Sequence, residues 1–439
     1  MVRLDITGSG AEAIARALEA ALRDERVASG EALPTVRGLA EELGVSPTTV
    51  AAAYRLLRHR GLIAGDGRRG TRVARRAPLL RRFPVPTASG AINVSDGNPD
   101  PSLLPDLKKL LARVELHDTL YGSACTLPAL AEAARARLSA DGIACDALTI
   151  VSGAMDGIER VLTTQLRSGD KVAVEDPGFA GVLDLVAALG LQAIPVEIDD
   201  EGMEPQALQA ALAKGVHAVI VTPRAQNPTG AATSARRAAA LRTILAAHPG
   251  TLLIEDDHAA GVAGQDLHTL CSRTTRRWAY LRSAGKSLGP DLRLAVLAGP
   301  EDVVAPVEAR HILGIRWVSH ILQGIVAQAW MTPAVTSTVA AAEKEYAARR
   351  RTLVEALAER GIAATARSGL NVWIPVREEA GALQALLTAG WSVAAGERFR
   401  LRTGPGLRVS IGRLPRARVP ELANALASAL APVRPVAEV

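Results

Sequence analysis

A single lysine lies in the stretch RSAGKSLGPDLRLAV, residues 282–296, among small and turn-forming residues. A solvated surface lysine needs no such surroundings. A lysine that must reach a carbonyl compound needs a close backbone approach and a desolvated amine. Lys286 is therefore a candidate for a covalent bond to a carbonyl ligand.

Other polar side chains follow short apolar runs. Asp256 and His258 follow TLLIE, and Asn227 lies in a tight turn after HAVIV. The run TIV is followed by SGAMDG and a helical pattern, so residues 153–155 would present backbone N–H groups to an anion. Each feature alone also fits a plain capping group or loop. An acidic residue at a strand end could instead pair with a protonated ring nitrogen.

The elements that must position these residues alternate along the chain. Helical patterns occur at 130–140, 155–167, 206–214 and 233–247, and short apolar runs of β type are TIVS, KVAV, HAVIV, TLLIE and LAVLAG. Such alternation predicts an α/β domain with parallel strands and crossover helices. Ligands in such domains bind beyond the carboxyl ends of the strands, which is where the candidate residues fall.

The net charge of +6 is confined to the N-terminal end. Residues 1–82 contain 15 arginines and 9 acidic residues, so the remaining 357 residues are balanced. Residues 55–82 hold ten of these arginines and one acid, Asp66. A basic segment of this kind suits a polyanion, although alone it would equally fit a solvated charged face.

The same end carries a helix-turn-helix pattern. Apolar spacing predicts a helix over about 36–43, a turn at Gly44, and a second helix with Ser46 as N-cap and Pro47 as its first residue. Thr48, Thr49 and Tyr54 of the second helix are predicted to reach base edges or phosphates. The following LIAGDGRRGTRVA predicts a two-stranded wing tipped with Arg68 and Arg69.

Composition bounds the remaining possibilities. A chain of 439 residues that is 48% hydrophobic and 22% charged is long enough for more than one domain. Three widely spaced cysteines, Cys125, Cys145 and Cys271, indicate neither a zinc site nor a disulfide framework. The sequence contains no signal-peptide core and no run of about 18 uncharged apolar residues, so we expect a cytoplasmic protein that does not enter the membrane.

A proline- and arginine-rich segment marks a domain boundary. Residues 75–90, RRAPLLRRFPVPTASG, contain three prolines and four arginines without a helical or strand period. We predict a DNA-binding domain at 1–75, a linker at 76–92 and a second domain at 93–439.

Residues 11–73 resemble the winged helix-turn-helix of the GntR family of regulators. The pattern L-P-S-x-R-x-L-A, L-G-V-S-x-x-T-V, A-Y and G-x-G-T is matched at 33–40, 43–50, 53–54 and 69–73, although the family usually has serine at Thr35 and arginine at Pro47. The resemblance implies binding to a double-stranded DNA operator. The contacting residues would be Arg37, Ser46, Thr48, Thr49, Tyr54, Arg68, Arg69 and Thr71.

Residues 93–439 resemble the fold type I aminotransferases, which bind pyridoxal 5′-phosphate (PLP). That fold implies a mainly parallel sheet with helices on both faces and a smaller C-terminal α+β subdomain. Lys286 would form a Schiff base with PLP, and Asp256 would hold the pyridinium nitrogen. The other implied positions are Asn227 and His258 at the ring 3′-oxygen, Phe179 stacked on the ring, and Ser283, Arg293, Gly153, Ala154 and Met155 at the phosphate.

Two further positions follow from the aminotransferase resemblance. Tyr121 matches the tyrosine that reaches the phosphate in the neighbouring subunit of a homodimer, and Arg408 matches the arginine that clamps a substrate carboxylate. Most of the family has tyrosine at position 258, and tyrosine or tryptophan at 179. Histidine can still donate to the 3′-oxygen, and phenylalanine can stack without a hydroxyl group.

A winged helix fused to an aminotransferase-like domain is the arrangement of the MocR subfamily of GntR regulators. The phrases TPRAQNPTG, EDDH and GKSLGPDLRLA look most similar to a type linked to vitamin B6 metabolism. We therefore expect a PLP-dependent transcriptional regulator that senses PLP, an amino acid or another amine. The alternatives are a working aminotransferase with an accessory DNA-binding domain, and a regulator that uses the fold only to dimerise. The localised arginine excess counts against the aminotransferase. The retained lysine, aspartate and arginine count against a fold used only to dimerise.

Overall fold

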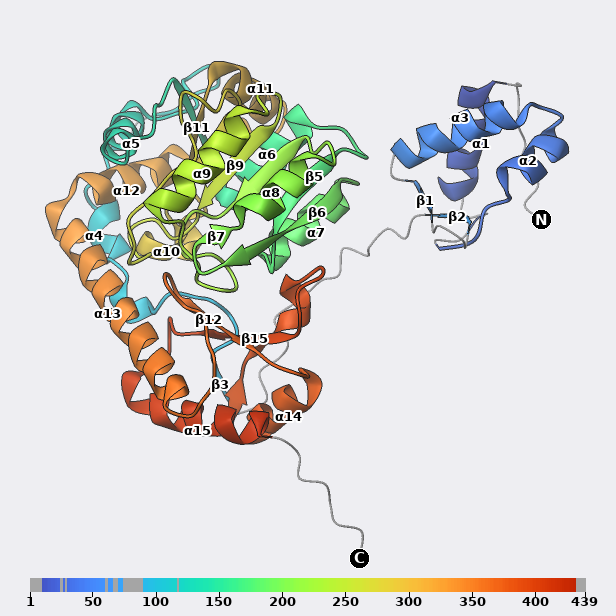
Figure 1. Ribbon diagram of the computed structural model, residues 1–439. Helices are drawn as coiled ribbons and strands as arrows, with labels where there is room; N and C mark the ends of the chain where they lie inside the picture. The colour runs from blue at the N-terminus through green and yellow to red at the C-terminus, as the bar shows by residue number, and fades with distance from the viewer. Residues whose placement is uncertain are drawn as a thin grey trace, which may run out of the picture. The chain divides into compact units, whose positions relative to one another are not determined.

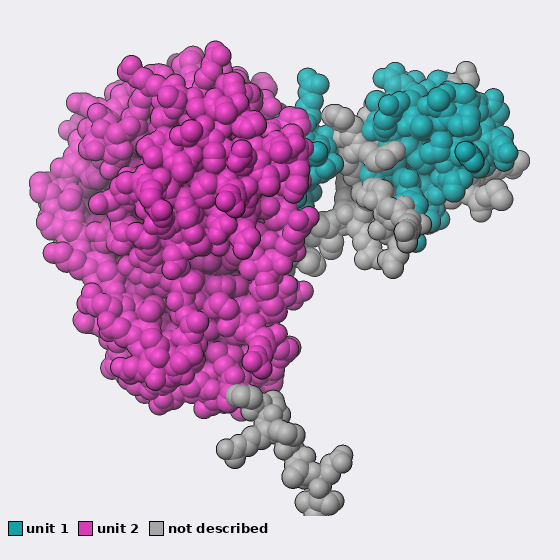
Figure 2. Space-filling view, viewed as in Figure 1, with its two compact units in different colours: residues 1–82, 166–172, 184–193 teal, residues 83–165, 173–183, 194–439 magenta. Residues whose placement is uncertain are grey.

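The computed structural model describes residues 10–23, 27, 30–59, 62–65, 70–73, 90–116 and 118–431. Figure 2 colours two compact units, of which the first contains residues 1–82 with the short segments 166–172 and 184–193. These two segments carry the beginnings of strands β5 and β6, which belong by hydrogen bonding to the large sheet of the second unit. Their fold is therefore described with that sheet.

The N-terminal unit contains three helices and a two-stranded ribbon (Figure 1). The elements are α1 (Ala11–Arg23), α2 (Val36–Leu43), α3 (Pro47–His59), β1 (Ile63–Gly65) and β2 (Thr71–Val73). The backbone N–H of Thr49 donates to Ser46 Oγ over 3.1 Å, which confirms Ser46 as the cap of α3. Gly44 ends α2 with φ +62°, a left-handed conformation that glycine adopts without strain.

A continuous apolar core holds this unit together. Val50, Ala53, Tyr54 and Leu57 on α3 are fully buried and pack in one cluster with residues of α1 and α2. Their spacing is that of one helical face. The ribbon pairs β1 with β2 in antiparallel register, with Ile63 opposite Val73, and both residues join the core. The predicted winged helix-turn-helix is confirmed.

The second unit is built on a mixed sheet with the order β4-β11-β10-β9-β8-β5-β6-β7. Its strands are β4 (Ala147–Val151), β5 (Lys171–Asp176), β6 (Gln192–Asp199), β7 (Gly202–Met203), β8 (Ala218–Val221), β9 (Leu252–Asp257), β10 (Trp278–Ser283) and β11 (Ala295–Gly299). Strands β8, β9 and β10 run parallel, whereas β11 is antiparallel to both of its neighbours. Every residue of β4, β8, β9 and β11 is buried, as expected for strands covered on both faces.

Helices pack against this sheet (Figure 1). They are α4 (Leu107–Leu111), α5 (Pro128–Ala140), α6 (Ala154–Gln165), α7 (Ala180–Ala188), α8 (Pro205–Leu212), α9 (Ala235–Ala246), α10 (Gly285–Leu288), α11 (Glu301–Ile312) and α12 (His320–Met331), with the short 3₁₀ helices η2 (Pro101–Leu103) and η3 (Pro290–Leu292). The long helix α13 (Pro333–Ala358) runs from α12 to the smaller C-terminal part. Among the described residues, no helix is long and apolar enough to cross a membrane.

The smaller C-terminal part combines short strands with two helices. Its elements are β12 (Asn371–Pro375), α14 (Ala380–Thr388), β13 (Trp391–Ser392), β14 (Ala394–Ala395), η4 (Gly396–Phe399), β15 (Gly406–Ser410), η5 (Arg416–Arg418) and α15 (Val419–Leu430). Strands β12, β15 and β14 form an antiparallel sheet. Strand β3 (Ile92–Asn93) pairs with β13. The segment after β3 reaches β15, where Ser95 accepts a hydrogen bond from Arg408 across 313 residues of sequence.

Candidate functional site

One cavity of about 240 Å³ lies between the large sheet and the smaller C-terminal part. Its wall contains all of the residues predicted at the cofactor and the carboxylate, apart from Tyr121. These are Gly153, Ala154, Met155, Phe179, Asn227, Asp256, His258, Ser283, Lys286, Arg293 and Arg408.

Strand ends explain this convergence. Strands β8, β9 and β10 run parallel, so the turn at Asn227, the end of β9 at Asp256 and the start of α10 meet at one edge of the sheet. Strand β4 ends beside them and leads through Gly153 into α6. Residues distant in sequence are thus brought together by sheet topology.

Lys286 lies half-buried on the four-residue helix α10. Its Nζ donates to the Gly97 carbonyl over 2.6 Å. Burial of the amine and the positive charge of Arg408 lower the pKa of Lys286 to about 8, whereas Asp96 opposes the shift. A lysine with a pKa of about 8 carries a substantial neutral, nucleophilic fraction near neutral pH.

Asp256 is buried at the end of β9. Burial raises its pKa to about 7, with additional repulsion from Asp257 and Glu175. Within the described chain its Oδ1 has no hydrogen-bond partner. A buried, unpartnered carboxyl oxygen facing a cavity is energetically unfavourable unless a ligand supplies a donor.

His258 is fixed in one tautomer by its neighbour. Its Nε2 lies 2.9 Å from the Ala225 carbonyl oxygen, which can only accept, so Nε2 carries the proton. Burial, reinforced by Lys286, lowers the pKa of His258 to about 4. The ring is therefore neutral at pH 7, and Nδ1 offers a lone pair rather than a donor.

The start of α6 and the Arg293 guanidinium lie together at the cavity wall. Gly153 has φ +92°, and a Cβ there would lie 3.2 Å from Arg293 Nη2, so a side chain would press against this guanidinium. Arg293 itself has φ +43°. The backbone N–H groups of α6 and the Arg293 guanidinium together supply donors and positive charge for a phosphate.

Arg408 on β15 lies at the opposite end of the cavity. Its Nη1 donates to Asn227 Oδ1 over 3.0 Å, and its Nη2 donates to the Ser95 carbonyl. Its guanidinium carbon lies 4.7 Å from the centre of the Phe399 ring. Burial and the charge of Arg398 lower its pKa to about 10, so Arg408 remains cationic at neutral pH.

Sequence reasoning missed part of this wall. Asp96 and Gly97 follow β3, and Asn371 begins β12. Gly97 has φ +68°, a left-handed conformation that favours glycine. The turn-forming composition of SDGNPDP was the available signal, because such runs place backbone carbonyls near ligands.

Tyr121 lies away from this cavity within its own chain. Its side chain is 82% exposed and lines a second cavity, where its ring centre lies 6.0 Å from that of Trp317. A role at a neighbouring subunit stays a prediction.

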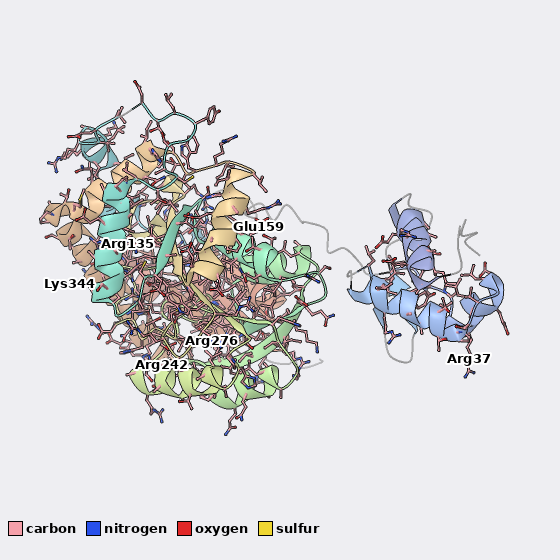
Figure 3. The ribbon with its side chains drawn as sticks, turned by 90° about the horizontal axis from the view of Figure 1, so that it is seen from above. Arg37, Arg135, Glu159, Arg242, Arg276 and Lys344 are labelled. Atoms are coloured by element: carbon pink, nitrogen blue, oxygen red, sulfur yellow. The ribbon has the colours of Figure 1, made fainter. Side chains whose placement is uncertain are left out.

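The N-terminal unit presents only some of the predicted DNA contacts. Arg37, Ser46 and Thr48 are exposed, and Figure 3 shows Arg37 projecting from α2. Thr49 and Thr71 are half-buried, and Arg68 and Arg69 lie outside the described residues.

The prediction for Tyr54 is wrong. Its side chain is fully buried in the core of the unit, and its hydroxyl donates to the Pro34 carbonyl over 2.8 Å. Burial raises the pKa of Tyr54 to about 12. Tyr54 anchors α3 rather than reaching DNA.

Comparisons with known proteins cover both units. Residues 10–73 match the gntR family of bacterial regulatory proteins, and residues 89–426 match aminotransferase class I and II. The chain is 40% identical over 410 residues to the vitamin B6 salvage pathway transcriptional repressor PtsJ of Salmonella typhimurium. The aligned region covers 91% of this chain and 94% of that protein. This chain belongs to the MocR subfamily of GntR transcriptional regulators. It is therefore a DNA-binding regulator with an aminotransferase-like domain.

Further comparisons give one more relative and the fold of the second unit. The pyridoxine biosynthesis regulator PdxR of Corynebacterium glutamicum is 26% identical over 286 residues, 62% of each chain. The kynurenine aminotransferase of Pyrococcus horikoshii superposes with a TM-score of 0.71 at 22% identity, covering 78% of this chain and 91% of that chain. The aspartate aminotransferase of Thermus thermophilus superposes with a TM-score of 0.69 at 20% identity, covering 78% of this chain and 92% of that chain. The second unit thus has the predicted fold type I architecture.

Proposed function

We propose that this regulator binds PLP at Lys286 and that the occupancy of the cofactor cavity controls its affinity for an operator. The observation that carries the proposal is the presence in one cavity wall of Lys286, whose pKa is lowered to about 8, and of buried Asp256, which has an unpartnered carboxyl oxygen. Lysine supplies the amine that can bond an aldehyde, and the carboxyl oxygen supplies the acceptor that a pyridinium N–H requires.

The remaining wall fits the rest of the group. The Arg293 guanidinium and the N-terminus of α6 would hold the phosphate, together with Ser283. Phe179 has space for its ring because a Cβ on Gly181 would lie 2.8 Å from it. PLP, when bound, supplies an aldehyde and an electron-withdrawing ring.

The polar groups near the ring 3′-oxygen have distinct capacities. Asn227 Oδ1 accepts from Arg408, which orients the amide N–H₂ as the donor toward the cavity. His258 offers a lone pair, because its one proton is held by the Ala225 carbonyl. Asn227 would therefore donate to the 3′-oxygen, and His258 would accept from it.

Arg408 gives the cavity a preference for carboxylates. Its planar guanidinium can bind a carboxylate through two N–H groups. We propose that an amino acid or a similar amine enters here, competes with Lys286 for the aldehyde, and frees the lysine side chain. Such a ligand can change operator affinity only if it binds the DNA-binding arrangement of the protein and the non-binding arrangement with different affinities.

We also propose the assembly and its place of action. Tyr121 would reach the cavity of a second copy, giving a two-fold dimer with two DNA-binding units. The proposed division is a DNA-binding domain at 1–75, a linker at 76–92 and an effector domain at 93–439, working in the cytoplasm. The names of PtsJ and PdxR support target genes in vitamin B6 metabolism.

The test measures operator affinity of the full-length protein with and without PLP, on a duplex first selected from random DNA. We expect PLP to change the affinity of the unaltered protein and of Lys344→Ala, whose lysine is exposed on α13 (Figure 3). Lys286→Ala should lose this response. An identical PLP response in Lys286→Ala would refute the proposal.

A second candidate is an active aminotransferase with an accessory DNA-binding domain. The observation that favours it is the same cavity, which holds lysine, aspartate and arginine together. Turnover of an amino acid and a keto acid at roughly 1 per second or more would support the enzyme, provided that no duplex is bound at low salt.

A further inference from the structure

Another cavity, here called the arginine cavity, lies between helices α5, α10, α12 and α13 and the end of β10. It has a volume of about 270 Å³. Its charged lining residues are Arg137, Arg224 and Arg282 together with the acidic Asp141 and Glu343, and none of them lines the cofactor cavity.

Two of these arginines are already held by carboxylates. Arg224 forms a bidentate pair with Asp257, with both N–O distances 2.9 Å. Arg282 pairs with Asp141 and lies 3.7 Å from Asp257. Tyr280 completes this buried network by donating to Asp257 and accepting from Arg282. The network holds these two guanidinium groups, each beside a carboxylate, in fixed positions at the cavity wall.

Arg137 is the exception on this wall. Its Nη2 donates to the Trp330 carbonyl over 2.9 Å, and its guanidinium lies 5.4 Å from the Trp330 ring centre. Among the described residues it forms no ion pair within 4 Å. Burial and then the charge of Arg282 lower its pKa, whereas Asp141 opposes the shift. Arg137 thus lies near the charge of Arg282, and Asp141, the carboxylate that acts on Arg137, is already paired with Arg282.

A second feature also points to a ligand. The side chain of Arg282 is 7% exposed, and its Nε has no hydrogen-bond partner within the described chain. The lining also includes the apolar side chains of Leu288, Trp330, Val335 and Val339. The cavity therefore offers N–H donors beside a hydrophobic surface.

We propose that the arginine cavity is a binding site for a small organic anion, a carboxylate or phosphate group carried on a short apolar body. The anion would accept hydrogen bonds from Arg137 and Arg282 and offset their repulsion, because charge-assisted hydrogen bonds to guanidinium groups are among the strongest in proteins. The apolar body would pack against Trp330 and α13. A volume of this size admits only a small molecule.

The position of the site ties it to the cofactor lysine. Ser287, which follows Lys286 on α10, lines the arginine cavity, and Ser283 lines both cavities. An occupant would therefore touch the helix that carries Lys286 from its other side. The site does not depend on PLP, so it can be tested on protein with or without the cofactor.

The experiment titrates the full-length protein with benzoate and phenyl phosphate at constant ionic strength, by calorimetry and by tryptophan fluorescence. Benzamide, with the same ring and no charge, is the ligand control. We expect saturable binding of at least one anion, no binding of benzamide, and a fluorescence change that disappears in Trp330→Phe. The anion that binds more tightly identifies the head group. Failure of both anions to saturate the protein would overturn the proposal.

Two variants locate the binding. Arg137→Gln should weaken it about tenfold or more, because a hydrogen bond to a charged group is lost. Arg135→Gln is the matched control, since Arg135 lies on the same helix α5 (Figure 3) and also donates to a backbone carbonyl, that of Cys145. Ala340→Phe should block the cavity from exposed α13 without removing charge. Unchanged affinity in both Arg137→Gln and Ala340→Phe would place the anion elsewhere and refute the site.

Discussion

Burial acts on Lys286 and Asp256 in the same direction, toward the neutral form of each. It lowers the pKa of Lys286 to about 8 and raises that of Asp256 to about 7. Water stabilises charged groups better than a protein interior does, so both residues are destabilised as ions before a ligand binds. This is the expected state of a site whose groups await a partner.

The lowered pKa of Lys286 predicts how PLP attaches. At pH 7 about a tenth of a lysine with a pKa near 8 is neutral, against less than a thousandth of an ordinary lysine. We expect the attachment rate to rise with pH and to level off above about pH 8. Borohydride reduction should place the label on Lys286, and Lys286→Ala should retain PLP only weakly. A rate that keeps rising to pH 10 would contradict the buried environment.

The raised pKa of Asp256 predicts a pH-dependent stability. Between its ordinary value of 3.8 and about 7 the folded protein holds a proton that the unfolded chain has lost, so this residue destabilises the fold increasingly as pH rises. Without PLP, Asp256→Asn should be more stable than the unaltered protein at pH 8. At pH 5 the gain in unfolding free energy should be smaller. Urea unfolding measures this, with exposed Asp266→Asn as control. Equal gains at both pH values would contradict the assignment.

Arg408 predicts which ligands the cavity distinguishes. Arg408→Gln removes the bidentate donor, so the response of operator affinity to an amino acid should be lost, whereas the response to PLP alone should persist. Arg413→Gln, on an exposed arginine 3.7 Å from Asp96, is the control. Retention of the amino acid response in Arg408→Gln would assign carboxylate recognition to another residue.

Residue-scale prediction from sequence succeeded where a short motif follows a strand. Asp256, Asn227 and Lys286 were found because strand ends and turns are visible in the sequence. Asp96 was missed because its segment reaches the cavity only through the pairing of β3 with β13. Tyr54 was misassigned although its spacing with Val50 and Leu57 marks the buried face of α3.

At the scale of elements, the strand-to-helix turns decide the shape of the site. The turn from β4 into α6 brings Gly153 against Arg293, and the turn from β10 into α10 brings Lys286 against Gly97. Sequence periodicity predicted β4, β8, β9 and α6 within a few residues, because each is a continuous apolar or amphipathic run. It did not predict the 26-residue α13. The buried apolar residues of this helix are interspersed with charged residues, and they belong to two different hydrophobic cores.

Gly153 provides the test at this scale. Gly153→Ala imposes a left-handed backbone on alanine, which costs about 1–2 kcal/mol, and it also pushes the Arg293 guanidinium aside. Gly390→Ala, with φ +84° and open space around it, imposes only the backbone strain. We expect similar losses of unfolding free energy in both variants, but weaker PLP binding in Gly153→Ala alone. Equal PLP affinities, measured by absorbance titration, would remove Arg293 from phosphate binding.

At the scale of the whole molecule, the excess positive charge lies in the part of the chain that carries the winged helix-turn-helix. The excess of +6 lies within residues 1–82, and the remainder of the chain is neutral overall. A uniform distribution would attract nucleic acid over the whole surface, whereas this one directs it to the N-terminal unit. The sequence alone established this division, because charge counting requires no knowledge of packing.

This division predicts how salt acts on operator binding. Lys and Arg contacts to phosphates release counterions, so log affinity falls linearly with log salt, by about 0.9 for each contact. Arg68→Gln with Arg69→Gln should weaken binding and reduce the slope by up to about 1.8, the sum for two lost contacts. Arg276→Gln, on an exposed arginine of the larger unit (Figure 3), should change neither. An unchanged slope in the double variant would mean that the wing tip does not contact phosphates, and that the exposed residues of α2 and α3 carry the interaction.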